Sequence, residues 1–140
     1  MVMLRIMLIF SVVIVAIGFG GSAIATSSDI TITSPKMVSL PGQELTSLQV
    51  GERIGVESVI TNHAVSEKKF TYLVQVLNDK GQAEYFEGLS ASILANQSFT
   101  VSQSWMPEKS GQYTVQTFVW ESLSIPTPIT KVIQTQITVE

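Results

Sequence analysis

The chain has 140 residues, 45% of them hydrophobic and 14% charged, so it is too apolar to remain disordered and long enough for one domain. Its net charge of -3 provides no basic surface for phosphate groups, which argues against nucleic acid as a partner. The absence of cysteine excludes disulfides, thiolate metal sites and a cysteine nucleophile, so packing must stabilise the fold.

The N-terminal segment is typical of export or membrane insertion. No charged residue lies between Arg5 and Asp29, and the run is rich in Ile, Val, Leu and Met. A charged start, an apolar stretch and a small-residue end predict a signal peptide cut after Ala25. The alternative is a retained anchor, because about 20 residues in a helix span a hydrocarbon core of about 30 Å. Both hypotheses divide the chain into a hydrophobic helix over 1–25 and an extracytoplasmic domain over 26–140.

The domain reads as all-β. Short β-branched and aromatic runs recur between turn signals, and no window shows a helical apolar period. The candidate strands lie, in chain order, at residues 29–33, 53–62, 69–78, 83–89, 97–105, 112–121 and 130–139, with 37–40 extending or splitting the first. The turn at 78–81 combines Asn and Asp with a glycine, which predicts a hairpin. Seven antiparallel strands are typical of an immunoglobulin-like β-sandwich.

Alternation along these strands predicts which side chains enter the core. The inward sets are Ile54, Val56, Ser58 and Ile60; Phe70, Tyr72, Val74 and Val76; Phe99, Val101 and Trp105; and Ile133, Ile137 and Val139.

The chain has few residues of the types that act in catalysis or bind metal ions. His63 is the only histidine, it lies in a predicted loop, and no nucleophile motif is near it in the sequence. One histidine and no cysteine do not make a copper site, and Asp29 and Asp79 lack the clustered spacing of a calcium site. We therefore expect no catalytic residue, metal site or cofactor. Asn96 begins an Asn-Gln-Ser glycosylation sequon on a predicted loop.

The segment "SGQYTV" resembles the start of the sixth strand in immunoglobulin-like sandwiches, where a tyrosine hydrogen-bonds back to the preceding connection. Together with "LQVGERIGVESVITNHAV" and "LANQSFTVSQSWMPEKSGQYTV", it makes residues 48–139 similar to prokaryotic cell-surface immunoglobulin-like domains of the CARDB-like, adhesion-related family. Small exported proteins of archaeal envelopes have a similar shape. The resemblance implies a tyrosine corner at Tyr113 and an inward Val115. A departure is Asn96, which stands near the usual place of a turn glycine.

With Val115 inward, the bulky side chains of alternate positions point outward. The third, sixth and seventh strands are neighbours in this fold, so their outward apolar residues should share a face and contact a protein partner. The predicted contact residues are Leu73, Leu77, Phe118, Trp120 and Val132. Two alternatives are a loop such as 121–129 that covers the aromatic residues, or a register slip that takes them into the core.

The leading hypothesis is a non-enzymatic, secreted or membrane-anchored adhesion module that binds an envelope or membrane protein, or a second copy of itself. The alternative is an accessory subunit of a membrane complex or filament, with residues 6–25 retained as a transmembrane helix.

Overall fold

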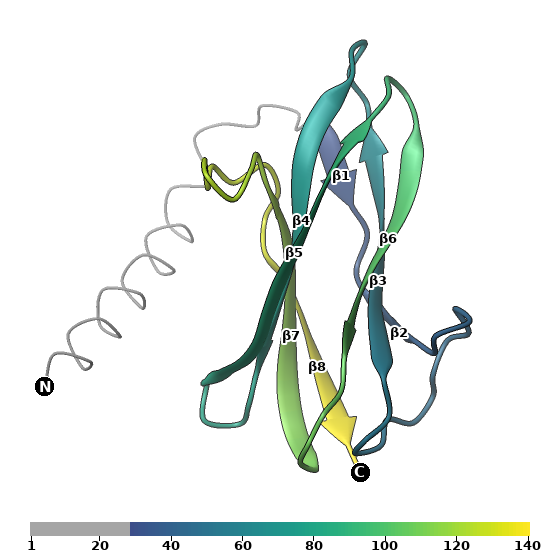
Figure 1. The fold of residues 1–140 in the computed structure, drawn as a ribbon, viewed down its shortest axis with the longest axis vertical. Helices are drawn as coiled ribbons and strands as arrows, with labels where there is room; N and C mark the ends of the chain where they lie inside the picture. Colours follow the sequence, from purple (N-terminus) through teal and green to yellow (C-terminus); the bar gives the residue numbers. More distant parts are fainter. Residues whose placement is uncertain (1–28) are drawn as a thin grey trace, which may run out of the picture.

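The computed structural model describes residues 29–140, which form eight strands in two antiparallel sheets packed face to face (Figure 1). The predicted all-β sandwich is confirmed. The predicted N-terminal helix and the division of the chain at residue 25 lie outside the described residues. Within residues 29–140, none of the structure is a helix suited to crossing a membrane.

The first sheet is built around β3 (Ile54–Asn62). One side of β3 pairs with β1 (Ile30–Ile32) and then β2 (Lys36–Val38), and the other side pairs with β6 (Ser98–Trp105). The predicted first strand is therefore two strands, which gives eight instead of seven. Pro35 lies in the break between them, and proline cannot donate a hydrogen bond to a neighbouring strand.

The second sheet has the order β5 (Ala83–Ile93), β4 (Lys68–Leu77), β7 (Gly111–Trp120) and β8 (Ile133–Val139). The predicted hairpin joins β4 to β5. Its turn is ordered by the side-chain oxygen of Asn78, which accepts hydrogen bonds from the backbone N–H groups of Lys80 and Gln82. Gly81 in the same turn has φ of 75°, a conformation that favours glycine.

The core lies between the sheets and contains nearly all of the predicted inward set. Three side chains of that set are less covered than expected. Phe99 points toward the interior, because it is opposite the fully buried Ile60, but it remains exposed at the edge of the first sheet. Ile133 and Ile137 on the edge strand β8 are only half-buried.

Two polar groups are buried in this apolar interior with their hydrogen bonds satisfied. The hydroxyl of Tyr72 donates to the carbonyl oxygen of Val56 at 3.2 Å and lies 3.0 Å from the Ser58 hydroxyl. Burial raises the pKa of Tyr72 to about 12. The amide nitrogen of Asn62 donates to three backbone carbonyls, those of Ser66, Ile93 and Leu94. Asn62 therefore connects the turn after β3 to the turn after β5 by hydrogen bonds.

The register of β7 agrees with the prediction. Alternate residues Tyr113, Val115, Thr117 and Val119 are buried against the core. The Tyr113 hydroxyl donates to the carbonyl oxygen of Lys109 at 2.6 Å, which is the hydrogen bond of a tyrosine corner. Its ring packs edge-on against Trp105 with 5.0 Å between centroids. Burial also raises the pKa of Tyr113.

Candidate functional site

The outer face of the second sheet carries the residues predicted to contact a partner. Leu73 on β4 is paired with Phe118 on β7, and Thr71 is paired with Trp120, so these side chains share the face turned away from the core. The adjacent register positions place Leu77 on β4 and Val132, just before β8, toward the same face. The predicted direction of all five contact residues therefore agrees with the strand pairing.

The predicted exposure is wrong for two of them. Leu73 is 0% exposed and Phe118 only 7% exposed, although both face away from the core. A Cβ atom placed on Gly88 would lie 3.1 Å from Leu73 Cδ2 and 3.5 Å from Leu123 Cδ2, so Leu123 approaches the outer face where β5 has no side chain. The segment 121–129 thus covers part of the sheet, as one of the alternatives anticipated.

This covering segment is held by its own hydrogen bonds. The backbone N–H of Glu121 donates to the Thr127 carbonyl at 2.9 Å, and the N–H of Ile125 donates to the Ser122 hydroxyl at 2.8 Å. Pro128 returns alongside Trp120. These hydrogen bonds give the loop a defined conformation, which holds Leu123 over Gly88.

Of the other predicted contact residues, Val132 is 45% exposed and Leu77 is half-buried. Three side chains around Trp120 form an exposed group, here named the outer-sheet patch: Phe86, Trp120 and Leu123. Phe86 is 46% exposed, Leu123 is 56% exposed and Trp120 is half-buried. The Trp120 ring lies 6.3 Å from Phe86 and 5.4 Å from Phe118, measured between centroids, so a buried ring supports the exposed ones. Aromatic rings at these separations attract each other.

A polar row borders the patch toward the other end of the sheet. Gln75, Gln116 and Gln134 are cross-strand neighbours on β4, β7 and β8. The side-chain nitrogen of Gln116 donates to the side-chain oxygen of Gln134 at 3.2 Å. An apolar centre with an uncharged, hydrogen-bonding border is the usual composition of a protein contact surface.

Phe86 and Leu123 were missing from the predicted contact set. The predicted face used only the third, sixth and seventh strands, so the strand at 83–89 was outside it, although Phe86 alternates correctly for the outer face. Leu123 lies in a loop, where strand alternation gives no direction. The proline-flanked apolar residues of that loop were the available signal.

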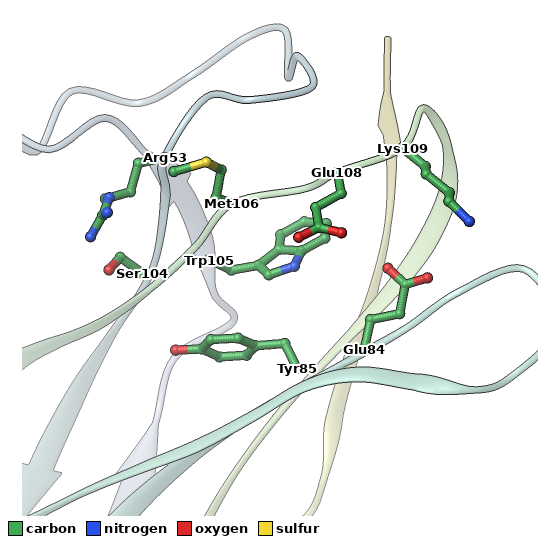
Figure 2. Close-up of a pocket in the computed structure, with 8 residues that line it drawn as sticks. All are labelled: Arg53, Glu84, Tyr85, Ser104, Trp105, Met106, Glu108 and Lys109. Atoms are coloured by element: carbon green, nitrogen blue, oxygen red, sulfur yellow. The ribbon is translucent and has the colours of Figure 1, made fainter.

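Apart from the outer-sheet patch, the surface has a hollow where β5 and β6 diverge, with a volume of about 520 Å³ (Figure 2). The rings of Tyr85 and Trp105 line it, and Figure 2 shows Arg53 on one side and Lys109 on the other. Its carboxylates, Glu84 and Glu108, and its hydroxyls come without a histidine or an aligned nucleophile and base.

His63 is far from that hollow in the fold. Its Nε2 atom lies 2.8 Å from the hydroxyl of Thr31, at an exposed position beside the start of β1. Across residues 29–140, no three His, Cys, Asp or Glu side chains gather into a group that could hold a metal ion.

Asn96 occupies the tight turn between β5 and β6. Its φ is 58°, the left-handed conformation that glycine adopts most easily, so asparagine stands where the family resemblance places a glycine. The residue is exposed. Glycosylation at Asn96 stays a prediction.

Comparison with solved structures relates this sandwich to known domains. The CARDB domain of a Pyrococcus furiosus protein, solved in complex with di-metal ions, is 15% identical with a TM-score of 0.56, and the match covers 79% of this chain and 92% of that one. The fold is CARDB-like. The C-terminal domain of wzt matches with a TM-score of 0.60 and 11% identity over 81% of this chain and 75% of that one.

Parts of larger enzymes also match. A β-glucosidase from Listeria innocua is 15% identical with a TM-score of 0.56, but the match covers 81% of this chain and only 16% of the enzyme. For a β-glucuronidase from glycoside hydrolase family 2, the matched share of the enzyme is 11%. No protein-family model matches the chain, and no curated protein matches its sequence. At such low identities the likeness concerns the fold alone.

Proposed function

We propose that the protein is a non-enzymatic interaction module of the cell envelope that binds a protein partner through the outer-sheet patch. The observation that carries this proposal is the patch itself: Phe86, Trp120 and Leu123 leave apolar surface exposed on the second sheet. Apolar surface gathered in this way marks contact sites, and aromatic residues supply most of the energy in such contacts.

The CARDB-like fold and the resemblance to adhesion-related domains support the same function. So does the low charge of the face, since interfaces are depleted of charged residues at their centres. The charge-free run before Asp29 supports a location outside the cytoplasmic membrane, either released or anchored.

A photo-reactive cross-linking amino acid at Phe86 tests the contact surface in intact cells. We expect covalent capture of a specific envelope protein from position 86. The matched control is the same amino acid at Thr138, an exposed residue of β8 at the opposite edge of the same sheet. Equal capture from both positions, or none from position 86, would contradict the proposal.

A binding assay with the captured protein then measures the contribution of each side chain. Phe86→Ser should weaken binding at least tenfold because it removes an aromatic anchor. The melting temperature should fall by only about 4–8 °C, because the ring is half exposed in the free domain and the fold is retained at the temperature of the assay. Thr138→Ser is the control and should bind normally.

The uncharged N-terminal run favours a second candidate function, that of an accessory subunit in a membrane complex or filament with residues 6–25 retained as a transmembrane helix. Mass spectrometry of the native N-terminus distinguishes the two. A protein that starts at Thr26 is released from the membrane, whereas an intact N-terminus favours the anchored subunit.

A further inference from the structure

Within residues 29–140, the two sheets have four edges, and three of them carry features that oppose pairing with another strand. Pro35 interrupts the edge formed by β1 and β2. The end of β8 is covered by a parallel bridge from Leu48 to Val139. On β5, the pairing register with β4 shifts near Glu84, and Glu87 adds a second charge. Proline, charge and bulges are the devices with which natural proteins protect sheet edges.

The fourth edge, β6, has none of these devices. Its eight residues make eight consecutive pairs with β3, from Thr61 opposite Ser98 to Ile54 opposite Trp105, without a register shift. The strand contains no proline and no glycine, and no charged residue lies in the sequence between Glu87 and Glu108. Among the strands that the structure describes, β6 pairs with β3 alone. A long, regular and uncharged edge of this kind is a template for another strand.

Hydrophobic residues next to this edge are directed inward but are not covered. Phe99 on β6 is opposite Ile60 and is 47% exposed. Leu89 on the neighbouring β5 is opposite Tyr72 and is 40% exposed. Both pair with fully buried residues, so they point into the sandwich. Phe99 lies on the last strand of the first sheet and Leu89 on the last strand of the second, so neither has a neighbouring strand on its outer side. One more strand beside β6 would extend that layer.

We propose that this strand is β6 of a second copy of the chain, paired antiparallel about a two-fold axis so that the two first sheets become continuous. The outward residues of β6 are all hydroxyls: Ser98, Thr100, Ser102 and Ser104. Because each hydroxyl both donates and accepts, a row of hydroxyls is complementary to its own copy. The absence of charge means that two copies bring no like charges together. A two-fold contact uses the same surface on both subunits, which requires this self-complementarity.

This contact lies on the first sheet, whereas the outer-sheet patch lies on the second, so the two proposals are independent. In a two-fold pairing centred on Ser102, Thr100 of one copy is opposite Ser104 of the other. Phe99 is then opposite Trp105, and its exposed ring gains an aromatic neighbour.

The chain has no cysteine, which permits single-cysteine cross-linking of the full chain without removing any native thiol. Ser102→Cys treated with a short bis-maleimide should give a covalent species of twice the chain's mass. The control is Gln136→Cys on β8, an exposed position at the far edge of the other sheet, which should stay monomeric. Adding Thr100→Lys to Ser102→Cys should reduce the cross-linked fraction at least tenfold, because a long charged side chain then lies opposite Ser104 of the other copy in the row of hydroxyls.

Two further variants assign the cause of that loss. Adding Gln136→Lys to Ser102→Cys introduces the same charge elsewhere and should leave cross-linking unchanged. Circular dichroism and melting of Thr100→Lys should match the parent, since Thr100 is exposed. Phe86→Ser should also leave the dimer intact, so a failure of the outer-sheet patch is detected separately.

The proposal is overturned if Ser102→Cys cross-links no more than Gln136→Cys, or if Thr100→Lys leaves the yield unchanged. It is also overturned if position 102 joins the chain to a different protein, because the edge then serves another strand.

Discussion

The stability cost of Phe118→Ala distinguishes outer-face side chains that stabilise the second sheet from those that are exposed for binding. Phe118 faces away from the core but is only 7% exposed, paired with Leu73 and with its ring 5.4 Å from that of Trp120. Truncating a packed phenylalanine to alanine costs about 3–5 kcal/mol of unfolding free energy. Because the site lies on the outer face and neighbouring side chains are able to close part of the space, we expect about 3 kcal/mol.

A loss of this size lowers the melting temperature of a domain near 100 residues by roughly 10–20 °C. Phe86→Ala is the matched control, since Phe86 is on the same face and in the same ring cluster but about half of its side chain is already exposed. Its truncation removes less buried area and leaves no closed cavity, so we expect about 1 kcal/mol.

Urea and thermal unfolding followed by far-ultraviolet circular dichroism measure both variants on one scale. This signal comes mainly from the backbone, and the unfolding midpoint is compared within each variant's own transition, so changes in the rings beside Trp120 alter its baseline and not the midpoint. If Phe118→Ala and Phe86→Ala unfold at the same midpoint, segment 121–129 does not seal the outer face, and the distinction between buried support and exposed contact is wrong.

Three further predictions concern polar groups in the core. The pKa of Tyr72 is raised from about 10 to about 12, so its contribution to stability is fully present below pH 10 and should fall by up to about 3 kcal/mol as the pH rises to 12. Urea unfolding at several pH values measures this loss of unfolding free energy, and most of the loss should be absent in Tyr72→Phe. Thr117→Val should stabilise the fold by about 1 kcal/mol, because the buried Thr117 hydroxyl has no hydrogen-bond partner, whereas Thr114→Val on the opposite face should change little, and a destabilised Thr117→Val would refute this reasoning. Asn62→Ala should cost about 3 kcal/mol because three carbonyl oxygens lose their donor, and an unchanged urea midpoint would show that the two turns hold without it.

The strands were readable from the sequence because the signals that place them are local. Alternation with period two depends only on neighbouring residues, and it assigned Tyr72 and Tyr113 correctly to the interior. The hairpin at 78–81 followed from the chemistry of asparagine and glycine. The break at Pro35 was harder to place, because either an extended or a split first strand agreed with the residues.

The candidate site was predictable only in part, for a different physical reason. By itself, the sequence determined which way each strand residue points, including the outward direction of Phe118 and Trp120. Only the tertiary structure decided which outward residues are covered, because this depends on where segment 121–129 lies and on the missing side chain of Gly88. In the same way, the exposure of Phe99 depends on where the first sheet ends. Direction is a property of the backbone at each residue, whereas burial is a property of whichever segment packs above it.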